Sequence, residues 1–231
     1  MTLLLPEARA LSYTAEAADK LLTVRFVSKK GATMTNIRTT ELHQAPADPE
    51  LVVVPAAVFL SISGTGAPAA PVWHRKKLFA SDIARELAKA GLAPEGTPAQ
   101  HMYYWYADDA PETNIADFYS VNPLTDLGYR ALAQIDPKTT LDDIAAARER
   151  AASASDEGDE IEIFTIPEQT VVQVMHTGPF STELATLARM GAEADAHGVK
   201  RSGPHQEIHL DPFTITSAQD TLRTIIRDPV A

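Results

Sequence analysis

Two stretches of the sequence repeat each other, and this repeat constrains the fold more than any other feature. Residues 54–66 read VPAAVFLSISGTG and residues 166–178 read IPEQTVVQVMHTG, so a proline and a Thr-Gly pair recur at the same places. A helical stretch follows each copy, ends near a glycine, and leads through a proline into a strand. The period is too long for a solenoid. The repeat predicts two strand-helix-strand-strand units in one domain, related by a pseudo-two-fold axis, with a ligand groove at their seam.

The remaining patterns predict which segments form strands and helices. Residues 21–27 and 32–37 flank Ser28–Gly31, whose glycine suits a turn, and predict a hairpin ahead of the repeat. Further strands are expected at 51–63, 100–107, 128–135, 161–165, 170–176, 205–210 and 221–227, and helices at 72–90, 141–150 and 182–196. Either Thr139 or Thr140 is the expected N-cap of the helix at 141–150, and Ser181 is that of the helix at 182–196. The result is an α+β fold with an antiparallel sheet, helices on one face and the other face free to form a groove.

Composition excludes several classes of protein. The chain has no cysteine, so it holds no disulfide and no thiolate metal site, and its formal net charge is −11. That charge argues against a phosphate-binding surface and favours cationic or neutral aromatic ligands. Because no apolar run is long enough to span a bilayer and the start has no basic n-region, we expect a cytoplasmic protein with neither a membrane nor a nucleic acid as partner.

The clearest candidate site is the strand His205–Leu210. Ile208 and Leu210 are expected to lie beneath the helices, while His205, Glu207 and His209 point to the open face. A carboxylate there can bind a cation or act as a general base, and the imidazoles can assist it. The alternative is a solvated polar stripe. A metal site is a further alternative, but residues that alternate along a strand more often form a polar stripe, so we expect no metal and no other cofactor.

The equivalent strand of the first unit supplies aromatic side chains. His101, Tyr103 and Trp105 are expected on the face that matches Glu207. Rings that face a carboxylate across a pseudo-two-fold axis form a box for a flat apolar or cationic ligand. Rings that fill the core are the alternative, since strands are rich in aromatic residues.

Three motifs in the second half resemble a known family. Residues 174–180 read VMHTGPF, residues 205–212 read HQEIHLDP, and residues 222–230 read LRTIIRDPV. They resemble the GyrI-like small-molecule-binding domain family, and in particular the stand-alone branch that includes cyclopropanoid hydrolases. The first half is similar in part, at NIRTTEL (36–42) and YWYAD (104–108). The resemblance implies an N-terminal extension over residues 1–34 and a GyrI-like domain over 35–231, with halves at about 35–150 and 160–231.

The resemblance also implies a site. The family has a buried glutamate in its central groove, which corresponds to Glu207. In the hydrolase branch a tyrosine two residues later and tryptophans from the first half complete the site, and here these positions hold His209 and Trp105. His209 keeps a group that can transfer protons. The expected catalytic residues are Glu207 and His209. The expected ligand contacts are Trp105, Tyr103, His101, His205, Met175 and Phe180.

Two functions follow, and the sequence does not choose between them. One is binding of a flat aromatic or amphipathic small molecule with hydrolysis of a cyclopropanoid genotoxin, a form of xenobiotic resistance. The other is binding without turnover, in a sequestering or sensing module. A third hypothesis is that the chain is an acidic interaction protein that acts on a topoisomerase. The ligand and the oligomeric state are not predicted.

Overall fold

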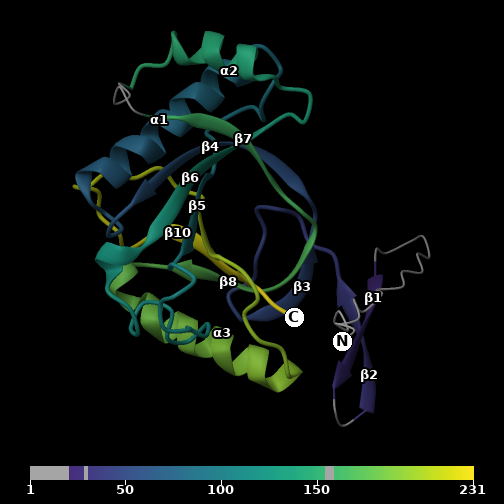
Figure 1. Ribbon diagram of the computed structural model, residues 1–231. Helices are drawn as coiled ribbons and strands as arrows, with labels where there is room; N and C mark the ends of the chain where they lie inside the picture. The colour runs from purple at the N-terminus through teal and green to yellow at the C-terminus, as the bar shows by residue number, and fades with distance from the viewer. Residues whose placement is uncertain (1–20, 29–30, 154–158) are drawn as a thin grey trace, which may run out of the picture. The chain divides into compact units, whose positions relative to one another are not determined.

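The computed structural model describes residues 21–28, 31–153 and 159–231, which fall into two compact units, Met1–Thr39 and Thr40–Ala231. The described part of the first unit consists of strands β1 (Leu21–Ser28) and β2 (Gly31–Arg38), which pair antiparallel. The predicted hairpin is therefore confirmed. The second unit holds all the other elements (Figure 1). The segment 151–159, between the two expected halves of the domain, lies largely outside the described residues.

The second unit is built on one open, eight-stranded antiparallel sheet, which confirms the α+β fold class. Its strands, from one edge to the other, run in the order β3-β8-β10-β9-β5-β6-β4-β7. The strands are β3 (Glu50–Val54), β4 (Ala57–Thr65), β5 (Gln100–Trp105), β6 (Gly128–Ile135), β7 (Ile161–Ile166), β8 (Gln169–Thr177), β9 (His205–His209) and β10 (Arg223–Pro229).

The strand order is symmetric about the central pair of β5 and β9. On one side β4 leads through a helix to β5 and β6, and on the other side β8 leads through a helix to β9 and β10. The edge strands are exchanged, because β3 precedes β4 but pairs with β8, while β7 precedes β8 but pairs with β4. The two halves of the sheet therefore share one order of elements, and their origin by duplication stays a prediction.

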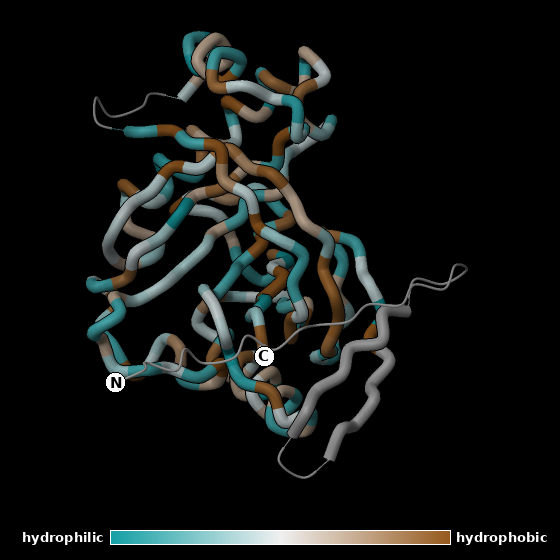
Figure 2. Tube along the Cα trace, turned by 45° about the vertical axis from the view of Figure 1, so that its right-hand side comes forward, coloured by the Kyte–Doolittle hydropathy of each residue, from teal (hydrophilic) through white to brown (hydrophobic). Residues whose placement is uncertain are grey.

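Helices α1 (Pro71–Ala88) and α3 (Glu183–His197) pack against the sheet, and α2 (Leu141–Arg148) packs against α1 (Figure 1). Short 3₁₀ turns lie at Leu124–Asp126 and Phe180–Thr182. The largest hydrophobic cluster lies between α1 and the sheet and is the main core of the unit. Figure 2 shows the apolar positions running along several of the strands.

Local sequence signals predicted most ends of the strands and helices, but two predictions were wrong. Thr140 caps α2 as expected, in a capping box with Asp143. Residues 51–63 were expected to form one strand, but the chain leaves the ladder after Val54 and resumes at Ala57, because Pro55 has no N–H to donate. Ser181 was wrong as a cap. It lies within the 3₁₀ turn, and the N-cap of α3 is Thr182.

Two glycines on neighbouring strands accommodate aromatic rings from the partner strand. A Cβ on Gly64 would lie 2.3 Å from the ring of Tyr129, and a Cβ on Gly128 would lie 2.5 Å from the ring of Trp105. Each ring therefore rests directly on a glycine backbone across the ladder. The close packing fixes the first half of the sheet around β6.

We expect Gly128→Ala to lower the free energy of unfolding by roughly 1–3 kcal/mol, because the new methyl group overlaps the indole of Trp105. Chemical denaturation of the purified variant measures this. Ser63→Ala, on the exposed side of β4, is the control and should be nearly neutral. A Gly128→Ala protein as stable as the parent would contradict the described packing.

Candidate functional site: a carboxylate pocket between two helices

Glu207 lies on the face of the sheet that the helices cover. The register sets Glu207 beside Met102 of β5 and Ile226 of β10. Met102 belongs to the core cluster beneath α1, so Glu207 shares that face. The expectation that Glu207 occupies the open face was wrong. The opposite face is itself covered, since Leu42 packs there and His43 contacts His101.

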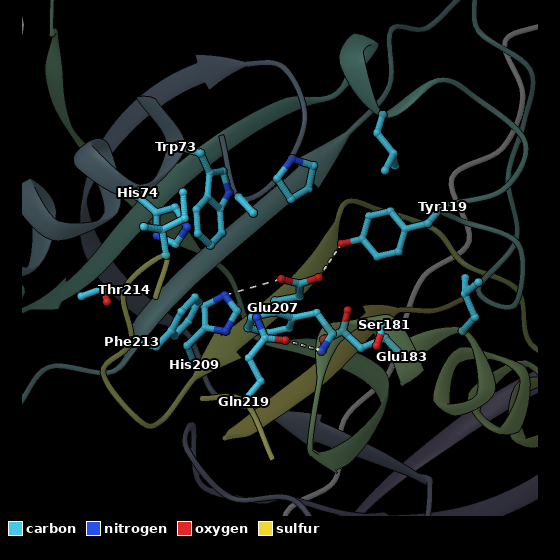
Figure 3. Close-up of a pocket in the computed structure, with 16 residues that line it drawn as sticks. Trp73, His74, Tyr119, Ser181, Glu183, Glu207, His209, Phe213, Thr214 and Gln219 are labelled. Atoms are coloured by element: carbon cyan, nitrogen blue, oxygen red, sulfur yellow. Dashed lines mark hydrogen bonds and ion pairs between the residues drawn. The ribbon is translucent and has the colours of Figure 1, made fainter. Parts of the chain in front are cut away.

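A cavity of about 380 Å³ opens at this point, between α1 and α3. Glu207 and His209 line it from β9, and Trp73 lines it from α1. Phe180 of the second 3₁₀ turn and Phe213 of the loop before β10 add two more rings. Figure 3 shows Phe213 beside His209 at this cavity. The strand pair at the centre of the sheet thus ends in an aromatic-walled pocket with a carboxylate at its base.

Two phenols hold the carboxylate of Glu207. The hydroxyl of Tyr119 donates to Oε1 at 2.5 Å, and that of Tyr104 donates to Oε2 at 3.4 Å. The indole Nε1 of Trp73 donates in turn to the Tyr104 hydroxyl at 3.0 Å. Burial, and next the charge of Glu207, raises the pKa of both tyrosines well above the usual value, so both remain protonated donors. Glu207 is 5% exposed, which confirms the expected burial.

His209 lies beside the carboxylate as a neutral imidazole. Its Nε2 is 3.5 Å from Oε2 of Glu207, and its Nδ1 is 3.4 Å from the hydroxyl of Thr224. Burial lowers the pKa of His209 well below its usual range, and the charges of Lys77 and His74 act in the same direction. A neutral ring can accept or donate a hydrogen bond at Nε2, depending on its tautomer.

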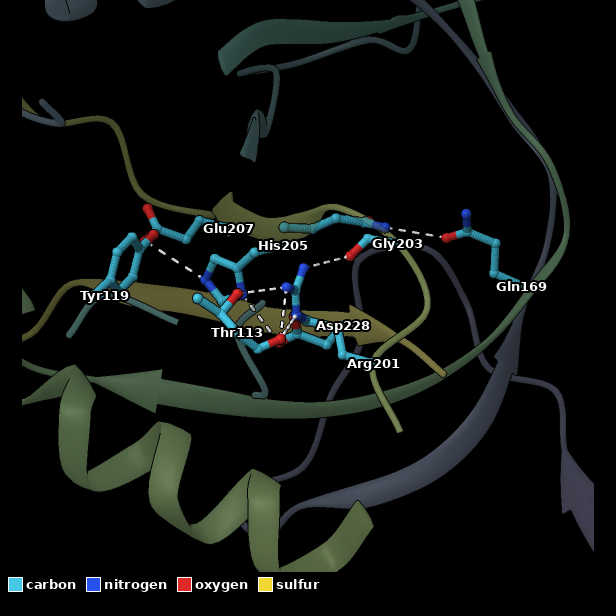
Figure 4. A network of polar contacts seen from close by, with 9 residues as sticks. Thr113, Tyr119, Gln169, Arg201, Gly203, His205, Glu207 and Asp228 are labelled. Atoms are coloured by element: carbon cyan, nitrogen blue, oxygen red, sulfur yellow. Dashed lines mark hydrogen bonds and ion pairs between the residues drawn. The ribbon is translucent and has the colours of Figure 1, made fainter. Parts of the chain in front are cut away.

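His205 lies at the opposite side of Glu207 and belongs to a second polar network (Figure 4). Its Nδ1 is 3.0 Å from Oδ2 of Asp228, and its Nε2 is 4.0 Å from Oε1 of Glu207. Both His205 and Asp228 are fully buried, and the ring of Phe118 stacks on His205. These contacts hold the His205 ring in place behind the carboxylate.

A buried lysine lies behind the aromatic wall. Lys77 of α1 is 1% exposed, and its Nζ is 3.1 Å from the ring centroid of Phe213 and 4.6 Å from that of Trp73. Burial lowers the pKa of Lys77 to about 6, although the charge of Glu207 acts to raise it. The amine is therefore mostly uncharged at neutral pH, and the pocket retains its acidic character.

The structure brings some of the expected site residues together and separates the others. Glu207, His209 and Phe180 line the pocket, and His205 lies directly behind it. The other four expected contacts lie on the opposite face: His101, Tyr103, Trp105 and Met175. We expected Glu207 to share a face of the sheet with His101, Tyr103 and Trp105, and this was wrong by one position. In the register of β5 and β9, Glu207 pairs with Met102, so Glu207 lies on the same face as Met102 and Tyr104.

Each of these four side chains has other neighbours in the structure. Trp105 rests on Gly128, and Tyr103 packs with Leu132 and Phe59. His101 contacts His43, and Met175 lies beside Ile225 in the register. The tryptophan that does face the carboxylate is Trp73.

Sequence reasoning missed Trp73, Lys77, Tyr104 and Tyr119. Trp73 and Lys77 are one turn apart at the start of the predicted helix 72–90, so a buried lysine on an aromatic helix face was a usable signal. Tyr119 lies in the irregular segment between β5 and β6, where no periodicity marks it. Across the described ranges, no group of three acidic or histidine side chains is placed to hold a metal ion. Nor does any helix in those ranges have the length and apolar character needed to cross a membrane.

With the fold and site in view, comparison with known proteins assigns the family. The model of the GyrI-like small molecule binding domain matches residues 47–230. The chain therefore belongs to the GyrI-like small-molecule-binding domain family. No curated protein matches the sequence.

Several solved structures share the fold. A conserved protein from Listeria innocua aligns with a TM-score of 0.64 and 20% identity, over 82% of this chain and 95% of that one. A hydrolase from Listeria innocua aligns with a TM-score of 0.64 and 19% identity, over 82% and 94%. The C-terminal domain of EcmrR aligns with a TM-score of 0.51 and 16% identity, over 80% and 97%. At these identities the likeness concerns the fold.

Lys77 gives the pocket a stability signature that depends on pH. Because its folded pKa is about 6 while an unfolded lysine titrates near 10.4, only the unfolded chain binds this proton between those values. Stability should therefore rise with pH across this window, by up to about 1.4 kcal/mol per unit from this group.

We expect Lys77→Met to be more stable than the parent near pH 7 and to lose this rise. Denaturant unfolding at several pH values measures the free energy of unfolding of parent and variant, and the difference between the two is followed with pH. Lys138→Met, an exposed lysine beside Asp136, is the control and should keep the parent slope. Parallel curves for parent and Lys77→Met would mean that the amine is solvated.

Proposed function

We propose that this pocket binds a flat aromatic or amphipathic small molecule and hydrolyses a strained, cyclopropanoid-type electrophile. One observation carries the proposal. A buried carboxylate, fixed by two phenols and flanked by a neutral imidazole at 3.5 Å, lies at the base of an aromatic-walled cavity. The rings of Trp73, Phe180 and Phe213 offer stacking surfaces for a planar ligand. Removal of a genotoxic electrophile in this way would serve xenobiotic resistance.

In this proposal Glu207 is the general base. It takes a proton from a water molecule whose oxygen bonds to the strained ring carbon. The carbon–carbon bond of the ring breaks, and its electron pair moves to a conjugated carbonyl oxygen, which takes up a proton. The net change is the addition of one water. His209, close to the same carboxylate, positions the water through Nε2. The phenols of Tyr104 and Tyr119 hold the carboxylate in one orientation during the transfer.

Binding without turnover is the second candidate, and the charge of the pocket favours it. The carboxylate of Glu207 lines the cavity, and no Lys or Arg is among the described residues that line it. A cationic aromatic ligand would pair with Glu207 and stack on Trp73. The Listeria hydrolase and the EcmrR domain share this fold but do not decide between the two candidates.

Glu207→Gln should abolish hydrolysis of a cyclopropanoid probe while the protein stays folded, because the amide keeps the shape of the side chain but is not a base. Mass spectrometry in ¹⁸O-labelled water measures turnover as incorporation of one labelled oxygen. Glu168→Gln, in the exposed connection between β7 and β8, is the control. Equal turnover by parent and Glu207→Gln would overturn the role of the base, whereas no turnover by the parent with tight binding would favour the second candidate.

His209→Tyr should retain activity and His209→Ala should lose roughly 10- to 100-fold, because Tyr and His can both donate a hydrogen bond to the reacting water and Ala cannot. Since burial keeps the pKa of His209 well below its usual range, its titration should not change the rate between about pH 6 and pH 8. Steady-state rates of the three proteins across that range measure both effects. Full activity of His209→Ala would show that the imidazole takes no part.

A further inference from the structure

A second carboxyl group lines the pocket, and the reaction as described above leaves it without a role. Glu183 is the first residue of α3, is 6% exposed, and lies among the side chains drawn around the cavity in Figure 3. Its Oε1 is buried and makes no hydrogen bond to any described residue. A buried polar atom without a partner is uncommon in a folded protein, and this one belongs to a side chain of the ligand cavity.

The surroundings of Glu183 disfavour its charge. Burial raises the pKa of Glu183 well above its usual range, and the charge of Glu207 adds to the effect. The phenols of Tyr104 and Tyr119 are uncharged and already donate to Glu207. The N-terminus of α3 acts in the opposite direction, because a helix start favours a nearby negative charge. Desolvation is the largest influence, so these surroundings favour the protonated form of the carboxyl group.

We propose that Glu183 is a neutral carboxylic acid that donates a hydrogen bond, and finally its proton, to a carbonyl oxygen of the ligand. This inference rests on the proposed function. In the reaction above, Glu207 takes the proton of the water, and Glu183 supplies the proton that the carbonyl oxygen gains as the ring opens. The proton balance closes when Glu207 passes its proton to solvent and Glu183 recovers one. Two carboxyl groups in one pocket thus divide the roles of base and acid, because their environments differ.

The inference narrows the class of ligand. A carboxylate at Glu207 prefers a cation or a donor, whereas a protonated Glu183 prefers an acceptor. The pocket therefore fits a planar molecule that carries a carbonyl oxygen conjugated to its electrophilic carbon. Such a molecule gains from both groups only when the oxygen lies on the α3 side and the electrophilic carbon lies next to Glu207. A purely cationic ligand would use Glu207 alone.

Three flat probes with one ring system separate the two carboxyl groups. 1-Methyl-4-quinolone carries the carbonyl and has no N–H, quinoline lacks the carbonyl, and N-methylquinolinium carries the positive charge. We expect the parent to bind 1-methyl-4-quinolone more tightly than quinoline by roughly fivefold or more, the worth of one buried hydrogen bond. Glu183→Ala should remove that preference and leave the affinity for N-methylquinolinium nearly unchanged. Glu207→Gln should lower the affinity for N-methylquinolinium and leave the preference for the carbonyl probe nearly unchanged. Calorimetric titration measures all nine affinities without any need for turnover.

Infrared spectroscopy tests the protonation state directly. The parent at pH 7 should show the carbonyl stretch of a protonated carboxylic acid, which should vanish in Glu183→Gln and persist in Glu207→Gln. If Glu183 variants do not fold, the acid band of the parent, followed through a pH titration, still decides the matter. With a cyclopropanoid substrate, Glu183→Gln should lower kcat by roughly 100-fold with little change in KM.

The outcomes separate this inference from the proposed function. Absence of turnover in the parent would reject hydrolysis and still leave the acid band and the carbonyl preference as tests of Glu183. Absence of the acid band, or a loss of N-methylquinolinium affinity in Glu183→Ala as large as in Glu207→Gln, would overturn the inference by showing an ionised Glu183. Full kcat in Glu183→Gln would also overturn it.

Discussion

The site depends on the stabilisation of one carboxylate in the middle of a sheet. A buried charge costs several kcal/mol unless hydrogen bonds replace the lost water. Glu207 meets this requirement with two phenols, one from the neighbouring strand and one from the irregular segment between β5 and β6. Trp73 of α1 then fixes one of the phenols through its indole N–H. Three separate parts of the chain therefore converge on Glu207, and the same contacts that stabilise it also place the aromatic walls of the pocket.

The opening between the helices follows from the symmetry of the strand order. α1 covers one half of the sheet and α3 the other, so the central pair of β5 and β9 lies at the seam. The polar residues of β9 face this seam. The same alternation that reads as a solvated stripe in the sequence therefore produces the base of a pocket. The opposite face is closed by the segment around Leu42, whose carbonyl accepts a hydrogen bond from the buried guanidinium of Arg227.

Local signals in the sequence were enough for most of the fold. The bounds of β6 were predicted to the residue, and the hydroxyl of Thr140 caps α2 as expected, because both depend on neighbours a few residues away. For the site, the motifs identified Glu207, His209 and Phe180. The partners of Glu207 could not be predicted, because they depend on the register between β5 and β9. A shift of one residue exchanges Tyr103 for Tyr104, and nothing within either strand specifies that register.

The position of the two tryptophans offers the most direct test of the account. The chain has two tryptophans, Trp73 in the pocket and Trp105 on the opposite face, where it rests on Gly128. In a titration with N-methylquinolinium, the tryptophan fluorescence of Trp105→Phe, which keeps Trp73, should therefore be quenched to saturation. The fluorescence of Trp73→Phe should show collisional quenching and little more. Saturable quenching in Trp73→Phe with none in Trp105→Phe would place the ligand on the other face of the sheet and contradict the account.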